Sequence, residues 1–138
     1  MKKKRVMAFG TFDHFHAGHE SYLRQAKSFG DELVVVIARD DTVEKIKSRK
    51  ADHDAKARKK AVMESGLADI VAIGNKDDKY AVIKKYKPDV IALGYDQFAF
   101  TFRLKKFLID EKINAKIVRL QSFKPQVYKT SLIRSKNE

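Results

Sequence analysis

The sequence contains no cysteine and no apolar run that approaches the length of a membrane-spanning helix. Without cysteine, the chain has no disulfides, thiolate metal ligands or cysteine nucleophiles. A spanning helix needs roughly 20 apolar residues, and the five-residue apolar segment after the basic Met1–Arg5 is too short for a signal peptide. We therefore expect a cytoplasmic protein with no membrane partner, whose chemistry depends on other side chains.

Acidic residues are in the minority, with 18 Asp and Glu against 30 Lys and Arg, a formal net charge of +12. Such a charge attracts polyanions but does not distinguish nucleic acid, anionic lipid and nucleotide phosphates. The basic residues are spread along the chain instead of forming one arm, which is typical of a solvated lysine-rich surface. Charge alone leaves the function open.

The chain has 138 residues, 43% of them hydrophobic, so we expect a single domain over residues 1–138. Short continuous apolar runs predict strands, and the segments between them carry helix formers with apolar residues three and four apart. The expected strands are Val6–Phe9, Leu33–Ala38, Ile70–Ile73, Val90–Leu93 and Ala115–Leu120. The expected helices are Ala17–Phe29, Asp40–Lys47, Asp54–Ser65, Lys79–Tyr86 and Phe100–Lys112.

This alternation predicts an α/β fold, a three-layer Rossmann-like domain with a mostly parallel five-stranded sheet. Ligands in such sheets bind beyond the carboxyl ends of the strands. The segments that follow the strands should therefore share one rim, and they are Gly10–His19, Arg39–Thr42, Gly74–Asp77, Gly94–Phe98 and Gln121–Ser131.

The segment after the first strand reads Gly10-Thr11-Phe12-Asp13-His14-Phe15-His16-Ala17-Gly18-His19, and a helix begins within its last residues. His16 and His19 lie three apart at a helix N-terminus, so both imidazoles can project to one side, where backbone N–H groups and the helix dipole favour an anion. Gly18 removes a side chain between them, and Gly10 lets the backbone approach a ligand closely. The pattern predicts a phosphate cradle.

Other interpretations of the residues compete with this one. Zinc binding by His14, His16 and His19 is disfavoured because no cysteine or zinc-helix spacing accompanies them, so we predict no metal ligand, and we interpret His14 as an exposed loop residue. A basic nucleic-acid-binding module would suit the net charge, but most Phe and Tyr residues lie in predicted core runs and no helix-turn-helix or zinc-finger pattern occurs. We therefore expect no nucleic-acid partner. A pseudoenzyme that only senses nucleotide stays open.

The same stretch resembles the signature of the HxGH nucleotidyltransferase superfamily, which contains glycerol-3-phosphate and choline-phosphate cytidylyltransferases, pantetheine-phosphate adenylyltransferase and archaeal-type FAD synthases. The resemblance lies in Gly10–Asp13 and in the His-x-Gly-His of His16–His19. It extends along the chain through Ser28–Leu33, Arg39–Asp41, Arg58–Lys59, Gly94–Gln97 and Lys129–Arg134.

The resemblance implies that an acceptor phosphate attacks the α-phosphorus of ATP or CTP in line and that pyrophosphate leaves, with Mg²⁺ on the triphosphate and a homodimer as the assembly. It implies catalytic roles for His16, His19, Lys47 and Arg134. It implies nucleotide binding by Gly10, Thr11, Phe12, Gly18, Arg58, Gly94, Asp96, Gln97, Thr130 and Ser131. Apart from the resemblance, Arg58 is interpreted as a solvated helix residue. Which basic residue closes over the triphosphate stays open among Lys45, Lys47, Arg49 and Lys50.

The acceptor is predicted from two segments, Arg39–Val43 and Gly94–Gln97, which are most similar to archaeal-type FAD synthases. These enzymes adenylate FMN to FAD. Glycerol-3-phosphate cytidylyltransferase is the alternative, because Lys129–Ser131 fits that group as well. Aromatic side chains near the rim offer a stacking surface for a flavin ring, namely Tyr95, Phe98, Phe100, Phe102 and Phe123.

Overall fold

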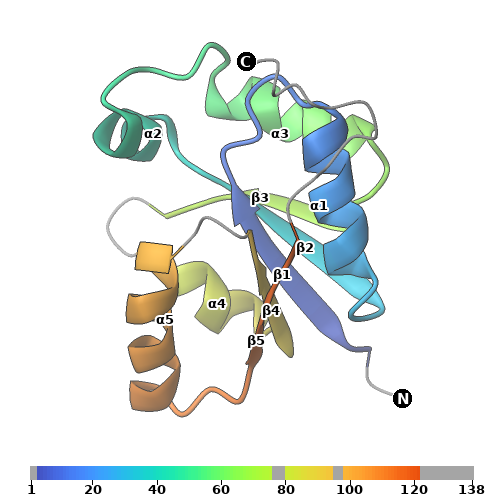
Figure 1. Cartoon of the computed structure of the whole chain (residues 1–138), viewed down its shortest axis with the longest axis vertical. Coiled ribbons are helices and arrows are strands. Elements are labelled where there is room, and N and C mark those ends of the chain that lie inside the picture. Colours follow the sequence, from blue (N-terminus) through green and yellow to red (C-terminus); the bar gives the residue numbers. More distant parts are fainter. Residues whose placement is uncertain (1–2, 76–79, 95–97, 122–138) are drawn as a thin grey trace.

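Strands and helices alternate along the computed structural model, which describes residues 3–75, 80–94 and 98–121. Figure 1 shows the arrangement of these elements. In chain order they are β1 (Arg5–Gly10), α1 (Ala17–Lys27), β2 (Glu32–Ile37), α2 (Asp40–Lys47), α3 (Ala55–Glu64), β3 (Ile70–Ile73), α4 (Ala81–Tyr86), β4 (Val90–Leu93), α5 (Phe98–Asp110) and β5 (Lys116–Arg119). Each predicted element is present.

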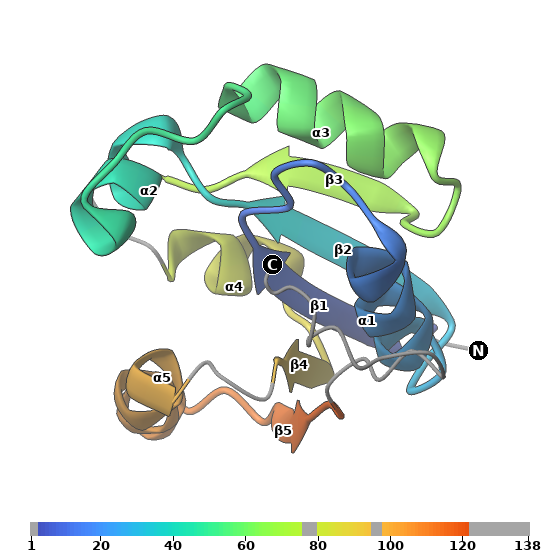
Figure 2. The same ribbon diagram turned by 45° about the horizontal axis from the view of Figure 1, so that its top comes forward.

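The five strands form one sheet in the order β3-β2-β1-β4-β5, and every pairing among them is parallel. The chain moves outward from β1 in one direction through β2 and β3, then returns to the other side of β1 for β4 and β5 (Figure 2). The predicted Rossmann-like architecture is therefore confirmed, and the direction of winding reverses between β1 and β4.

Alternate strand residues enter two separate cores, which makes the domain three-layered. Val6 and Ala8 of β1 pack in the core shared with α1 and α3, whereas Met7 packs in the core shared with α4 and α5. Because both faces are covered, the central parts of the strands are continuous apolar runs, as the sequence predicted, whereas the edge strand β5 begins with the exposed Lys116 and ends with the exposed Arg119. The two helix layers lie on opposite sides of the sheet in Figure 2.

Helix boundaries differ from the prediction where local caps end a helix early. The first helix stops at Lys27 because Ser28 caps it, its hydroxyl donating to the carbonyl of Gln25. The last helix begins at Phe98 and ends at Asp110, and Lys112 follows in the left-handed conformation with φ 55°. Among the described residues, no helix combines the length and the apolar character needed to cross a bilayer.

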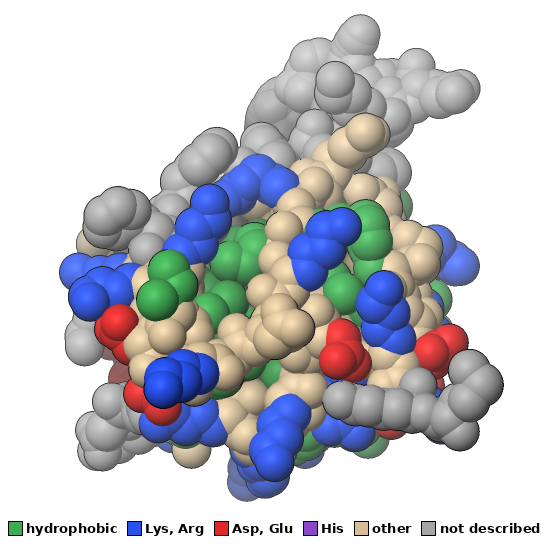
Figure 3. Space-filling model, turned by 90° about the horizontal axis from the view of Figure 1, so that it is seen from below, with side chains coloured by type: hydrophobic (Ala, Val, Ile, Leu, Met, Phe, Trp, Pro, Cys, Tyr) green, Lys and Arg blue, Asp and Glu red, His purple; other side chains and the backbone are tan. Residues whose placement is uncertain are grey.

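Positive charge extends well beyond the carboxyl-end rim of the sheet. The face seen from below in Figure 3 displays many Lys and Arg side chains around apolar patches and few acidic groups, and none of its described side chains is a histidine. This distribution fits the solvated basic surface expected from the composition.

Candidate functional site

The site begins where β1 and β4 part. Their pairing ends at Ala8 and Ala92, whereas β1 stays paired with β2 as far as Gly10. The hydroxyl of Tyr22 on α1 lies in the gap, 3.1 Å from the carbonyl oxygen of Phe9 and 3.0 Å from that of Ala92, and it accepts from the Phe9 N–H at 3.3 Å. A reversal of winding in an α/β sheet opens a ligand crevice at this point. The sequence alone did not indicate that Tyr22 lies in this gap.

His16 and His19 together cap α1. The backbone N–H of Gly18 donates to Nδ1 of His16 at 3.0 Å, and the backbone N–H of His16 donates to Nδ1 of His19 at 3.2 Å. This reciprocal capping box normally uses Ser or Thr with Glu or Gln. Here imidazoles supply both acceptors, so the helix N-terminus and the two rings form one rigid unit.

The cap also orients the protons of the two rings. Because each Nδ1 accepts a hydrogen bond, the neutral rings carry their proton on Nε2, which faces away from the helix backbone. The rings are stacked with their centroids 3.8 Å apart, so the two Nε2–H groups can address one ligand. Partial burial lowers the pKa of His16, and the charge of His14 lowers it further. His16 is therefore suited to donate a hydrogen bond as a neutral ring at neutral pH.

Phe12 lies beneath these histidines and belongs to the core, with 3% of its surface exposed. Its ring meets the His19 ring edge-on at 5.3 Å and stacks on Tyr22. The Phe12 side chain therefore supports His19, and nucleotide binding by Phe12 stays a prediction. A Cβ on Gly10 would lie 2.7 Å from the Phe12 ring, so glycine is required there for packing whether or not a ligand approaches.

Arg58 is a buried residue, which corrects its interpretation as a solvated helix residue. Its side chain has 0% exposure, and it donates to the carbonyl oxygens of His53 and Thr11 at 2.9 Å each and to Asp40 at 2.8 Å. Asp40 opens α2, and Thr11 belongs to the loop after β1. In this conformation the guanidinium ties three segments together beneath the rim and turns no donor toward solvent.

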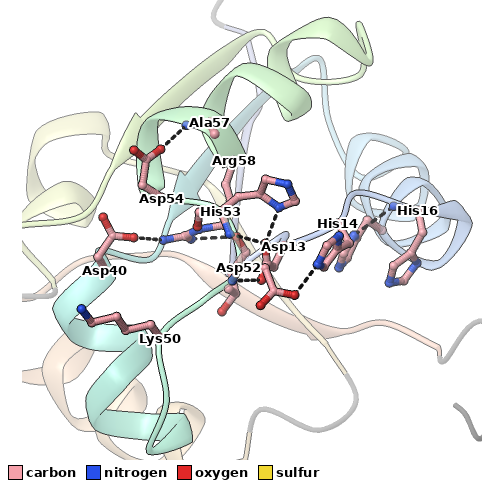
Figure 4. A network of polar contacts seen from close by, with 12 residues as sticks. Asp13, His14, His16, Asp40, Lys50, Asp52, His53, Asp54, Ala57 and Arg58 are labelled. Carbon is pink, nitrogen blue, oxygen red and sulfur yellow. Dashed lines mark hydrogen bonds and ion pairs between the residues drawn. The ribbon is translucent and has the colours of Figure 1, made fainter.

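The loop between α2 and α3 is fastened to the loop after β1 by a second polar cluster (Figure 4). Asp13 accepts from the backbone N–H groups of Asp52 and His53, and its Oδ1 lies 2.9 Å from Nδ1 of His53. Nε2 of His14 lies 2.6 Å from Oδ2 of Asp52. His14 is exposed, as predicted. Its contact with Asp52 was not predicted, and the Asp52-His53-Asp54 run before α3 was the only feature of the sequence that could have indicated it.

These contacts shift the pKa values of both residues that follow Phe12. Burial of Asp13 opposes ionisation, but hydrogen bonds from the His53 ring and from the backbone N–H groups of Asp52 and His53 lower its pKa to about 2. The hydrogen bond to Asp52 raises the pKa of His14. The cluster is therefore rich in charge beside the phosphate cradle.

The remaining predicted site residues divide into those at the rim and those outside the described residues. Gly94 directly follows β4, and its carbonyl accepts from Arg119 at 2.9 Å. Lys47 is the last residue of α2. The side chains of Lys45 and Lys47 lie outside the described part of the chain. Arg49 and Lys50, in the loop after α2, are exposed. The predictions for Tyr95, Asp96, Gln97, Phe123, Thr130, Ser131 and Arg134, and for the side chains of Phe98, Phe100 and Phe102, lie outside the described residues.

Comparison with known proteins identifies relatives along almost the whole chain. The family model described as "Cytidylyltransferase-like" matches residues 7–136. An FAD synthase of Thermoplasma acidophilum is 40% identical over 132 residues, covering 96% of this chain and 92% of its own. An FAD synthase of Methanococcoides burtonii is 42% identical over 116 residues, covering 84% of this chain and 80% of its own.

Solved structures agree on the fold. A lipopolysaccharide core biosynthesis protein from Thermoplasma volcanium superposes with a TM-score of 0.82 at 37% identity, covering 88% of this chain and 99% of that one. A pantoate–β-alanine ligase from Francisella tularensis superposes with a TM-score of 0.65 at 16% identity, covering 89% of this chain and 60% of that one. At that identity the second likeness concerns the fold alone.

Proposed function

Because the chain belongs to the cytidylyltransferase-like family, we propose that it is a nucleotidyltransferase that moves AMP from ATP to the phosphate of FMN, giving FAD and pyrophosphate. The observation that carries this proposal is the similarity to FAD synthases, at 40% identity over 96% of the chain. Such chemistry needs hydrogen-bond donors to the phosphate oxygens. The histidine-capped helix supplies them beside the point where the winding of the sheet reverses.

In the proposed reaction, an oxygen of the FMN phosphate forms a bond to the α-phosphorus of ATP. The bond from that phosphorus to the bridging oxygen of the β-phosphate breaks, and the electron pair leaves with pyrophosphate. No covalent enzyme intermediate is required. Catalysis of this type depends on positioning and on stabilising charge on the phosphate oxygens. The Nε2–H groups of His16 and His19 are the donors we assign to those oxygens.

Arg58 acts in this proposal as a positioning residue. By holding Thr11 and Asp40, it fixes the loop after β1 against the start of α2. The left-handed Ser48 ends α2, and the chain then carries Arg49 and Lys50 along the loop clamped by Asp13. Together with Lys47, these cations are the candidates for closing over the triphosphate.

The remaining proposed ligand contacts lie beyond the clamped loop. Gly94, Asp96 and Gln97 are proposed to read the base, and Thr130, Ser131 and Arg134 to hold phosphate oxygens.

Magnesium is proposed to enter with the nucleotide. Mg²⁺ prefers oxygen ligands, retains several waters and binds chiefly through substrate phosphates, so the imidazole-rich cradle suits a metal carried by the triphosphate better than a resident one. When bound, the ion neutralises charge on the phosphates. We further propose a cytoplasmic homodimer without a membrane or nucleic-acid partner. Sedimentation equilibrium tests the dimer.

Pyrophosphate release provides the direct test of the reaction. The purified chain with Mg²⁺ is incubated with ATP and FMN, and in parallel with CTP and glycerol 3-phosphate. We expect pyrophosphate, and FAD by chromatography, only in the first mixture. Release in the second mixture alone would replace the adenylyltransferase assignment with the cytidylyltransferase one.

A further inference from the structure

A cluster of metal-ligating side chains lies outside the phosphate cradle, and the proposed reaction uses none of them. Asp13, His14 and His53 each offer one ligand atom, and these atoms all lie within 4.8 Å of one another. Asp13 and His14 follow β1, whereas His53 precedes α3, so the cluster joins segments about 40 positions apart. In Figure 4, Asp13 and His53 are turned toward each other, and His14 is turned toward Asp52.

The donor set suits a borderline transition metal. Imidazole nitrogen is a good ligand for Zn²⁺, Co²⁺, Ni²⁺ and Fe²⁺, whereas Mg²⁺ prefers carboxylate, phosphate and water oxygens. Two imidazoles and one carboxylate come from the cluster itself. Asp52 contacts His14 from outside this set, since its Oδ2 lies 2.6 Å from Nε2 of His14, as an outer-shell carboxylate does. Three protein donors and one water complete a tetrahedral site.

One pair of ligand atoms already has nearly the spacing of ligands around one ion. When each ligand atom lies about 2.1 Å from a metal, neighbouring ligand atoms are about 3.0 to 3.4 Å apart. Nδ1 of His53 and Oδ1 of Asp13 are 2.9 Å apart. A metal can replace the proton that they share with little movement of either side chain.

The exposure of the residues suits an accessible but supported site. The Asp13 side chain is 15% exposed, whereas the His53 and His14 side chains are 50% and 60% exposed. Asp13 is also oriented by the N–H groups of Asp52 and His53, and such second contacts fix a ligand before the metal arrives. The Asp13 carboxylate is thus held in place before the ion binds, and the exposed rings of His14 and His53 complete the site from the solvent side.

We propose that Asp13, His14 and His53 bind a divalent transition-metal ion that fastens the loop carrying Arg49 and Lys50 to the loop after β1. The site is independent of the proposed reaction and of the nucleotide. Its consequence is a fixed path for the two exposed cations of that loop.

Cobalt absorption spectroscopy tests the site directly. The full chain is stripped with a chelator and titrated with Co²⁺ without nucleotide. We expect visible d–d bands that saturate at one equivalent, disappear when Zn²⁺ is added and persist in excess Mg²⁺. His53→Ala and His14→Ala should each raise the Co²⁺ dissociation constant by at least about 100-fold. Losing an outer-shell partner of a ligand already weakens metal binding by up to about 100-fold, and losing the ligand itself weakens it at least as much.

Two control variants identify which histidines bind the ion. His16→Ala removes a ring of the phosphate cradle, and Lys56→Ala removes an exposed cation from α3; both should bind Co²⁺ as the parent does. Circular dichroism verifies that every variant is folded. The proposal is overturned if no bands appear even with Co²⁺ in large excess, if His16→Ala abolishes them, or if neither His14→Ala nor His53→Ala weakens binding. If no bands appear, the loop before α3 and the loop after β1 are joined by hydrogen bonds alone.

Discussion

His16 uses one ring for two purposes. Its Nδ1 accepts from Gly18 and closes the helix cap, which leaves Nε2 facing away from the helix backbone. A substitution to alanine removes both functions, so its effect on turnover alone would not separate them. Asparagine is among the best N-cap residues and restores the cap without an imidazole N–H.

We predict that His16→Asn unfolds at nearly the same urea concentration as the parent, whereas His16→Ala loses about 1 kcal/mol of stability. Both variants should lose turnover by a factor of about 100 or more, as expected for a missing charge-stabilising donor. Urea denaturation and pyrophosphate release measure the two effects. Full activity in His16→Asn would reduce the role of His16 to capping.

At the scale of elements, Arg58 links α3 to α2 and to the loop after β1. Removing a buried guanidinium leaves the carbonyl oxygens of Thr11 and His53 without their donor. Losing one partner of a buried pair costs about 3–5 kcal/mol. Because Asp40 is exposed and its carboxylate can be solvated, we expect the loss of stability to lie near the lower end of this range.

We therefore predict that Arg58→Met, which keeps an unbranched apolar stem but removes the guanidinium, lowers the free energy of unfolding by about 3 kcal/mol. Lys56→Ala on the exposed face of the same helix is the control and should change stability by less than about 0.5 kcal/mol. Urea denaturation measures both. Equal stability of the two variants would contradict the buried role of Arg58.

Asp69 joins the start of β2 to the end of α1. Its carboxylate accepts from Lys27 and from the backbone N–H of Leu33, and the Lys27 contact lowers its pKa. Because the pKa is lower in the folded state, the stabilisation is present above the unfolded-state value of 3.8 and is lost as the pH falls through the folded-state value.

Asp69→Asn keeps an acceptor for Leu33 but removes the charge. We predict that the parent is more stable than this variant at neutral pH, by less than about 1 kcal/mol because the pair is partly exposed. The difference should shrink as the pH drops below 3.8. Urea midpoints over pH 7 to 3 test this, and Lys27→Met should abolish most of the difference. A constant difference across that range would exclude the charge as its cause.

The elements of the fold were predictable because each depends on local pattern. Apolar runs such as Val90–Leu93 predicted buried parallel strands, and the spacing of His16 and His19 was consistent with a helix N-terminus. The burial of Arg58 was not predictable, because its acceptors come from three separate segments. The pairing of Asp13 with His53 likewise depends on loops that meet only in the folded chain.

The whole molecule carries a large formal positive charge, and many Lys and Arg side chains lie on the face shown in Figure 3. Such a field draws any polyanion to the surface, but attraction through counterion release weakens steeply with salt. The donors in the cradle are different, because they are held in fixed geometry by the helix cap. Specific turnover and general polyanion binding should therefore separate as the ionic strength rises.

We predict that raising salt from about 50 to about 200 mM weakens binding to duplex DNA by about 1,000-fold or more if six or more phosphates are contacted. Over the same range, FAD formation from ATP and FMN should fall far less, because donors in a partly buried site are screened less than surface charges. Fluorescence anisotropy with a labelled duplex and the pyrophosphate assay measure the two in matched buffers. DNA binding that survived the higher salt while turnover collapsed would identify the basic surface, and not the capped helix, as the functional site.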